Sequence, residues 1–272
     1  MDNRKIVVVR GAGDLASGTI FCLHQCGFRV AAAEIEQPTA IRTGAAFCQA
    51  MYEGSVQVEG ETARRAESLE EISVCWQRDE IPIVPDPDLS LCLTLQPDIL
   101  VDAAIAKRNL GTRMDMAPLV IALGPGFTAG KDCCYVIETM RGHNLARIIS
   151  RGSALANTGV PGIIAGFGKE RVIHAPAEGI FTGIAAIGDT VRKGQLIARV
   201  GDCPVTASID GLLRGILHDG LFVPEGFKIA DIDPRLSEKQ NCFTISDKAR
   251  AIAGSVLTAI CMDDYRNQKG IR

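Results

Sequence analysis

A glycine-rich stretch near the start of the chain has the residue types and spacing that bind a phosphate group. Residues 11–16 read Gly-Ala-Gly-Asp-Leu-Ala and match the pattern G-x-G-x-x-A. Gly11 permits a tight turn, Gly13 lets a phosphate approach the backbone, and Ala16 allows close packing of a helix. The N-terminus of that helix then faces the anion. The stretch predicts a nucleotide or nucleotide-bearing cofactor, with four candidate binding residues: Gly11, Ala12, Gly13 and Asp14.

An acidic residue follows at the distance expected of a ribose ligand. Glu34 lies about twenty residues beyond the glycines, as in dinucleotide-binding proteins whose acid bonds a ribose hydroxyl. Glu36 could substitute for it, and Arg42 would allow an NADP-like preference. The alternative is a purely structural turn, because Asp14 would repel a phosphate unless its side chain points away.

A second glycine-rich loop, residues 124–131, reads Gly-Pro-Gly-Phe-Thr-Ala-Gly-Lys. It fails the Walker pattern, because Pro125 occupies the first glycine position and Asp132 replaces the Ser or Thr that holds magnesium, which excludes a P-loop ATPase. Its backbone N–H groups could still form an anion-binding nest, with Gly124, Gly126 and Phe127 as candidate cofactor-binding residues. A rigid turn that only reverses the chain is the alternative.

Three basic side chains are candidates for catalysis or for binding an anion: Arg141, His143 and Lys107. The sequence predicts that a short strand ends at Glu138 and that a polar turn then starts a helix. Arg141 and His143 would stand where the N-terminus of this helix meets the sheet edge. Arginine forks onto phosphate or carboxylate, and histidine can exchange a proton near neutral pH. A structural histidine is the alternative for His143.

The pattern of apolar segments predicts an α/β fold with a Rossmann-like, doubly wound parallel sheet. Residues 5–10 form a β-branched strand, a helix runs to Gly27, and residues 28–34 form the next strand, which together make a βαβ unit. The alternation continues downstream and places Asp102 at the carboxyl end of a strand, where ligands bind in such sheets. The remaining expected elements are a hairpin over 55–63, a helix over 66–78, and strands over 81–84, 99–102 and 118–123.

A repeat marks the C-terminal third. Residues 173–200 align without gaps on residues 205–232, at an offset of 32, with nine of 28 positions identical. Each copy is expected to be a set of short strands that shares one core with the other. The two copies resemble the halves of a biotinyl/lipoyl-like barrel-sandwich domain. In carrier domains of that class the modified lysine sits in the turn between the halves, and residues 201–204, Gly-Asp-Cys-Pro, contain none.

These patterns predict three domains. Residues 1–170 form the cofactor-binding domain, residues 171–235 the all-β barrel, and residues 236–272 a C-terminal segment. Within that segment, residues 246–265 have apolar residues at helical spacing after the Ser246 cap, so this helix should pack back on the first domain.

Composition excludes several classes of function. The formal net charge of −3, with scattered Lys and Arg, provides no basic stripe for nucleic acid. No apolar run approaches the length of a membrane span, and the N-terminus has no signal-peptide pattern, so we expect a cytoplasmic protein. Ten cysteines show no CxxC spacing, which predicts no metal site.

The ordered set of motifs resembles one family. The motifs are RGAGDLASG (10–18), Glu34 through Pro38 to Arg42, VDAAIAKRN (101–109), ALGPGFTAG (122–130), VIETMRGHNL (136–145), NTGVPG (157–162) and the barrel. Together they resemble the YqeB-type accessory proteins of selenium-dependent molybdenum hydroxylase systems. The resemblance implies a cytoplasmic maturation factor that binds a molybdopterin-type cofactor and acts on a molybdenum hydroxylase apoprotein. Arg141 would then clamp the phosphate of the cofactor.

Two other functions fit the same residues. An NAD(P)-dependent oxidoreductase would use the first βαβ unit and Glu34, with Lys107 or His143 as proton donor. A non-catalytic scaffold would bind a partner through the barrel and leave the glycine loop empty. A homo-oligomer is compatible with each of the three functions.

Overall fold

The protein, described by a computed structural model over residues 4–159 and 162–271, divides into two compact units. Unit 1 contains the chain up to Pro38, residues 47–157 and the chain from Ile245 onward; unit 2 contains residues 39–46 and 158–244. These bounds differ from the expected 1–170, 171–235 and 236–272, because residues 39–46 and 236–244 group with the strands of the sequence repeat. Val160 and Pro161 of the NTGVPG motif lie outside the described residues.

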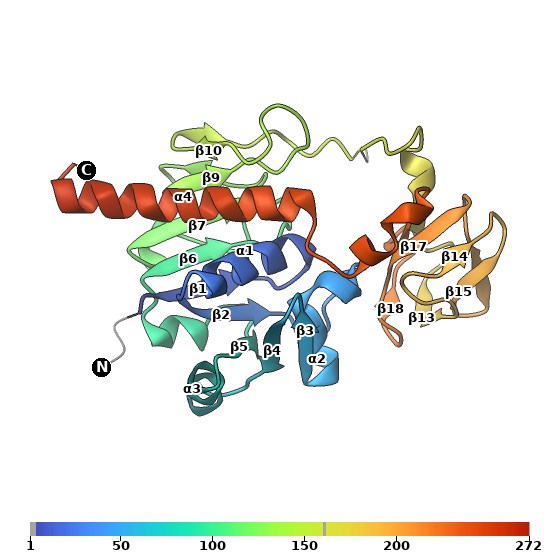
Figure 1. Ribbon diagram of the computed structural model, residues 1–272, viewed down its shortest axis with the longest axis horizontal. Helices are drawn as coiled ribbons and strands as arrows, with labels where there is room; N and C mark the ends of the chain where they lie inside the picture. The colour runs from blue at the N-terminus through green and yellow to red at the C-terminus, as the bar shows by residue number, and fades with distance from the viewer. Residues whose placement is uncertain (1–3, 160–161, 272) are drawn as a thin grey trace. The chain divides into compact units, whose positions relative to one another are not determined.

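Unit 1 is built on a large, mainly parallel sheet (Figure 1). Within the described residues its nine strands lie in the order β10-β9-β7-β6-β1-β2-β5-β4-β3. Neighbouring strands from β9 to β4 are parallel, whereas β3 and β10 are antiparallel edge strands. The strands are β1 (Ile6–Arg10), β2 (Arg29–Glu34), β3 (Ser55–Val58), β4 (Glu61–Arg65), β5 (Ile81–Pro85), β6 (Ile99–Asp102), β7 (Leu119–Leu123), β9 (Tyr135–Ile137) and β10 (Ile148–Ile149).

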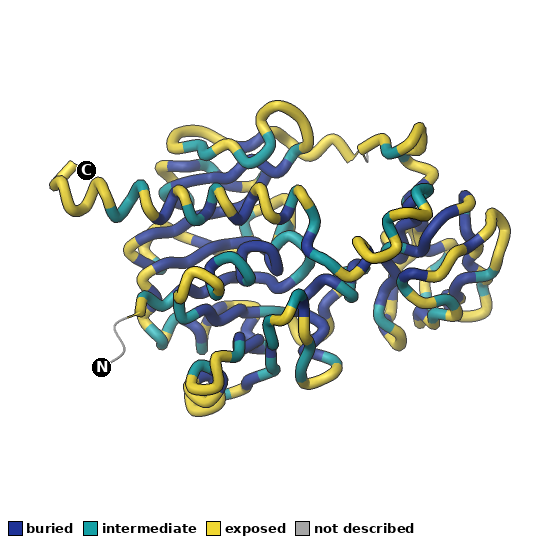
Figure 2. Tube along the Cα trace, viewed as in Figure 1, coloured by how far each residue is buried: buried dark blue, intermediate teal, exposed yellow. Residues whose placement is uncertain are grey.

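The central strands are continuous apolar runs because helices and loops cover both faces of the sheet. Val7, Val8 and Val9 of β1 are fully buried, and Figure 2 shows the central strands of the sheet mainly in dark blue. Around the sheet lie α1 (Asp14–Gln25), α2 (Ala50–Glu53) and α3 (Leu69–Gln77), and the small pair β8 (Thr128–Ala129) and β11 (Gly152–Ser153). The expected mixed α/β class with a large parallel sheet is therefore present.

One expected helix is a hairpin instead. The sequence predicts a helix after Glu138, but turns follow β9 and lead into β10, which pairs antiparallel with β9. Gly142 adopts φ 131° and Ala146 φ 66°, and neither value is compatible with an α-helix. Arg141 and His143 consequently lie in a turn and not at a helix N-terminus.

The C-terminal helix α4 (Asp247–Lys269) belongs to unit 1 and packs against α1. Figure 1 shows it running along the sheet beside α1. Ser246 caps its N-terminus by accepting a hydrogen bond from the Ala249 N–H. The two helices approach closely at Gly18, where an added Cβ would lie 2.8 Å from the Ala249 Cβ. Among residues 4–159 and 162–271, no helix has both the length and the apolarity that a membrane crossing requires.

Unit 2 reproduces the sequence repeat strand by strand. The first copy contributes β12 (Val172–His174), β13 (Gly179–Gly183), β14 (Thr190–Val191) and β15 (Leu196–Val200); the second contributes β16 (Cys203–Thr206), β17 (Gly211–Ile216), β18 (Phe222–Val223) and β19 (Lys228–Asp233). The described strands form two four-stranded antiparallel sheets, in the orders β12-β19-β17-β14 and β16-β15-β13-β18. Exchanging the two copies converts one order into the other. Each sheet therefore contains strands of both copies, so neither copy can complete a sheet alone.

The contact between α1 and α4 predicts opposite effects for two glycine-to-alanine changes. Gly18→Ala places a methyl group against Ala249, so the helices must move apart and the free energy of unfolding should fall by about 1–3 kcal/mol. Gly254→Ala is the matched control on α4, because its Cβ meets open space; it should raise that free energy by up to about 1 kcal/mol. Urea unfolding of both variants tests this, and equal effects would contradict the packing.

Candidate functional site

The candidate site lies where the strand order of the parallel sheet reverses. From β1 the chain proceeds through β2 and β5 on one side of the sheet, and then returns to form β6 and β7 on the other side of β1. Arg10 at the end of β1 is in register with Asp102 at the end of β6. The loops that follow these two residues lie at the carboxyl edge of the sheet, and ligands of open α/β sheets bind at this position.

The N-terminus of α1 is the part of this edge best suited to an anion. Gly13 occupies the N-cap position, and in the described structure no side chain caps the helix there, whereas Ser68 caps α3 and Ser246 caps α4. The first N–H groups of a helix have no acceptor within it. Gly13, Asp14 and Leu15 are partly exposed, so these N–H groups lie near the surface.

Gly11 and Ala12, the first two residues of the glycine loop, have structural roles. Both are buried. Gly11 adopts φ 93°, and an added Cβ would lie 3.0 Å from the Ala104 Cα, so both its backbone conformation and its packing require glycine. The Ala12 carbonyl accepts hydrogen bonds from the Cys48 N–H at 2.8 Å and from the Ser17 hydroxyl at 3.0 Å. Of the predicted loop residues, Gly13 and Asp14 therefore remain for contact with a ligand.

Glu34 holds the glycine loop through both of its carboxylate oxygens. Its Oε2 accepts the Ala12 N–H at 2.7 Å and its Oε1 accepts the Ile35 N–H at 2.8 Å. Burial raises the pKa of this carboxyl, although the two N–H donors act in the opposite direction. The spacing that predicted a ribose ligand thus brings the acid to the protein's own loop.

The two alternatives to Glu34 are also engaged elsewhere. Glu36 is exposed and pairs with Arg65 at 2.7 Å. Arg42 is buried in unit 2, where its Nη2 donates to the carbonyls of Asn241 and Thr244, both at 3.1 Å. Arg42 therefore has a structural role in unit 2 and does not support an NADP preference.

A buried cluster fixes the loop that follows β6. The Thr112 hydroxyl donates to Asp102 Oδ2 at 2.6 Å, and the Ala104 N–H donates to Asp102 Oδ1 at 3.2 Å. Arg10 donates to the Thr112 hydroxyl at 3.2 Å and lies 3.8 Å from Asp102 Oδ2. Asn109 Oδ1 accepts the Thr112 N–H at 2.7 Å. The sequence indicated Asp102 from its place at the strand end, but contains no signal for its pairing with Arg10 and Thr112.

This loop carries Lys107 and packs on the second glycine loop. Lys107 is exposed and adopts φ 62°. Gly126 adopts φ 109°, and a Cβ there would lie 2.6 Å from the Arg108 Cα; a Cβ on Gly124, at φ 76°, would lie 2.6 Å from Thr139 Oγ1. Phe127 is buried in the hydrophobic core. The packing of Gly124, Gly126 and Phe127 thus has an explanation within the protein.

Charged side chains gather at the same edge near the start of α4. Arg141 forms a two-pronged pair with the Asp247 carboxylate, with both distances at 3.1 Å. Glu138 is buried and accepts the N–H groups of Met140 and Leu155, both at 2.8 Å. His143 is exposed in the turn beyond Arg141.

Lys248 is the functional candidate that the sequence did not reveal. Its ammonium is partly buried, and burial lowers its pKa, with the charge of Arg141 acting in the same direction. Asp14 and Glu138 oppose this shift, so both lie close enough to Lys248 to interact with it. Lys248 is the second residue of α4, and only the packing of α4 on α1 brings it to the glycine loop.

The arrangement can bind an anion, because helix N–H groups and cationic side chains lie at one sheet edge. Among the described residues, no cluster of three or more His, Cys, Asp or Glu side chains could hold a metal ion.

The buried Asp102 predicts a pH dependence of stability. Burial raises the pKa of this carboxyl, so the folded state binds its proton more tightly than the unfolded state. Stability is therefore lost as pH rises from the ordinary carboxyl pKa of about 4 through the folded value. Relative to Asp102→Asn, the unsubstituted protein should lose free energy of unfolding as the pH rises above about 4. Urea unfolding across this range tests it, with exposed Asp88→Asn as the control; parallel profiles for Asp102→Asn and the unsubstituted protein would contradict it.

Comparison with solved structures gives only weak likenesses. The product-bound ectoine utilization protein EutE (DoeB) from Ruegeria pomeroyi has 14% identity and a TM-score of 0.26, covering 84% of this chain and 85% of that chain. An aspartoacylase family protein from Mesorhizobium loti has 11% identity and a TM-score of 0.29, covering 86% of each chain. Both scores are too low to support an argument. No protein-family model matches the chain.

Comparison of sequences gives a much stronger relationship. The chain is 52% identical over 268 residues to the uncharacterized protein YqeB of Escherichia coli strain K12. The alignment covers 98% of this chain and 49% of that protein, so the chain spans about half the length of the curated relative it matches. This relationship supports the YqeB-type resemblance seen in the motifs.

Proposed function

We propose that the chain is an accessory or maturation factor for a selenium-dependent molybdenum hydroxylase, and that it binds the phosphate of a nucleotide-bearing, molybdopterin-type cofactor at the N-terminus of α1. One observation carries the proposed site: a partly exposed helix N-terminus without a side-chain cap, at the strand-order reversal of a parallel sheet. The hydroxylase, its selenium dependence and the pterin come from the motif resemblance.

The local charges support a phosphate at this position. The first N–H groups of α1 and the helix dipole favour an anion. Lys248 and Arg141 add positive charge at the same edge, and both interact with acidic neighbours that a phosphate could displace or share. When bound, the cofactor would supply the molybdenum-ligating pterin, and the residues of this chain would hold and orient its phosphate.

Unit 2 is proposed as a biotinyl/lipoyl-like barrel-sandwich domain that docks on the hydroxylase apoprotein. The equivalent strand orders of its two sheets support this architecture. Residues Gly201 and Asp202 form the turn between the two copies, and Cys203 begins β16. Without a lysine in this turn, a docking role fits the unit better than a carrier role.

The oxidoreductase alternative loses part of its basis. A dinucleotide site needs an acid directed at the ribose, whereas both carboxylate oxygens of Glu34 accept backbone N–H groups of its own unit. The scaffold alternative is distinguished from cofactor handling by the measurements below.

Gly13 offers a direct test of the site. Its φ of −71° suits any residue, and aspartate is a favoured N-cap, so Gly13→Asp should fold normally. The new carboxylate would accept the α1 N–H groups and repel a phosphate, so ligand retention should fall at least about tenfold. Gly13→Asn is the matched control, because it has the same shape without the charge, and it should retain more ligand than Gly13→Asp.

The measurement is mass spectrometry of small molecules released by denaturing the purified protein, with fluorescence detection of oxidised pterin. The proposal is supported if the unsubstituted protein releases pterin or its nucleotide and Gly13→Asp does not. Release of NAD or NADP would instead support the oxidoreductase function. If the protein releases neither a pterin nor NAD(P), and neither ligand raises its thermal stability, the scaffold function remains. If Gly13→Asp retains the ligand, the proposed site is wrong.

Lys248 provides an independent prediction. Lys248→Met keeps most of the side-chain volume but removes the charge beside the glycine loop, so retention of a phosphate-bearing ligand should fall by about tenfold. Lys269→Met, at the far end of the same helix, is the control and should retain the ligand fully. Equal retention by the two variants in the same mass-spectrometric measurement would exclude Lys248 from the site.

A further inference from the structure

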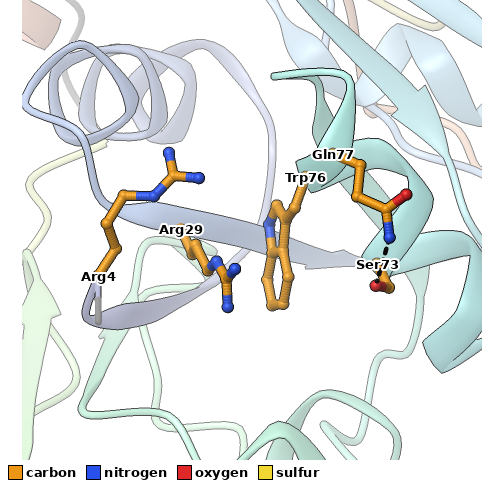
Figure 3. A pocket seen from close by; sticks show the side chains of 5 residues that line it. All are labelled: Arg4, Arg29, Ser73, Trp76 and Gln77. Atoms are coloured by element: carbon orange, nitrogen blue, oxygen red, sulfur yellow. Dashed lines mark hydrogen bonds between the residues drawn. The ribbon is translucent and has the colours of Figure 1, made fainter. Parts of the chain in front are cut away.

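A hollow lies at the opposite end of the parallel strands from the glycine loop. Its volume is about 310 Å³, and it is lined by Arg4, Arg29, Ser73, Trp76 and Gln77 (Figure 3). Arg4 precedes β1 and Arg29 is the first residue of β2, whereas the other three residues lie on α3. All five belong to unit 1, and none of them lies in the glycine loop or in α1.

The aromatic wall of this hollow is fixed in orientation. Trp76 donates from its indole Nε1 to the Val30 carbonyl at 2.8 Å, which ties the ring to β2. The Arg29 guanidinium lies 5.5 Å from the centre of the indole ring, at a distance typical of a cation–π contact. Figure 3 shows Arg29 between Arg4 and Trp76. The positive charge of Arg29 is therefore held over the indole ring.

The two arginines give the hollow its preference for an anion. Figure 3 shows both guanidinium groups on the side of the hollow away from Gln77 and Ser73. A guanidinium carries five N–H donors in a planar fork, so each arginine can keep its contacts within the protein and still bind phosphate oxygens. The opposite wall is neutral: Gln77 and Ser73 form a hydrogen bond of 3.4 Å and offer amide and hydroxyl groups to a polar ring.

The size of the hollow limits the ligand. Pockets for small ligands range from about 300 to 1,000 Å³, and this one lies at the lower end of that range. The volume fits one ring system with one phosphate and is small for a dinucleotide.

We propose that this hollow is a binding site for a planar aromatic heterocycle that carries a phosphate, of the size of a nucleoside monophosphate. The ring contacts the Trp76 indole and the polar wall, and the phosphate binds Arg4 and Arg29. This site does not depend on the function proposed for the glycine loop.

The composition of the chain provides a specific probe. Trp76 is the only tryptophan among the 272 residues, so a change in tryptophan fluorescence on titration reports on its surroundings. AMP should change the fluorescence saturably, whereas adenosine and inorganic phosphate should each bind at least about tenfold more weakly, because each lacks half of the contacts. The absence of a saturable change with AMP, or equal binding of AMP and inorganic phosphate, would overturn the proposal.

Arginine variants assign the signal to this hollow. Arg4→Met and Arg29→Met should each weaken AMP binding by about tenfold, because each removes a charged partner of the phosphate. Arg78→Met is the control, since Arg78 is exposed at the end of the same helix α3 but does not line the hollow. If Arg29→Met unfolds, Arg4→Met decides alone, because Arg4 precedes the first strand. Unchanged affinity in Arg4→Met would refute the site.

The same titration with Gly13→Asp separates the two sites. A fluorescence change that persists in this variant supports AMP binding in the hollow, whether or not the glycine loop binds its own ligand. If the change disappears in Gly13→Asp and persists in Arg4→Met, AMP binds at the glycine loop, and the proposal for the hollow is wrong.

Discussion

The buried Asp102 carboxylate holds together the sheet edge on which the candidate site depends. It accepts hydrogen bonds from the Thr112 hydroxyl and the Ala104 N–H, while Arg10 lies close to both Asp102 and Thr112. These contacts fix both ends of the loop after β6. Because this loop packs on Gly11 and Gly126, the Asp102 cluster determines the position of the two glycine-rich loops as well.

Four glycines of the two glycine-rich loops serve two different purposes. Gly11, Gly124 and Gly126 have positive φ values and lie too close to other protein atoms to admit a Cβ without a shift. Gly13 has an ordinary backbone conformation and stands at the uncapped start of α1. A glycine that the local backbone does not require is a better indication of a ligand than one that packing explains. For this reason the proposed phosphate site centres on Gly13, with Lys248 and Arg141 nearby.

Unit 2 shows how a repeat can be interdependent. Every strand of the first copy has its counterpart 32 residues later, yet each sheet contains strands from both copies.

Buried ion pairs accompany this arrangement in unit 2. Arg171 pairs with Asp231 at 3.2 Å, and Asp233 accepts from Arg214 at 3.1 Å and from Arg235 at 2.8 Å. The arginine contacts lower the pKa of Asp233 despite its burial, so this carboxylate is favoured in its charged form.

The sequence by itself determined the elements whose signals are local. The first βαβ unit, the hairpin of β3 and β4, the strands β5 to β7, the C-terminal helix and the 32-residue repeat all follow from apolar periodicity, glycine placement and capping. The hairpin after Glu138 has no comparable local signal, because its short strand β10 is defined by pairing with β9 and not by a pattern of its own.

The tertiary structure alone decided which side chains meet. Glu34 lies at the expected distance in sequence, but its partners are the N–H groups of Ala12 and Ile35. Lys248 reaches the glycine loop only because α4 packs on α1 where Gly18 meets Ala249, more than two hundred residues apart. Sequence patterns report the conformation of neighbouring residues, whereas a binding site depends on contacts between distant ones, and those arise only when the elements pack.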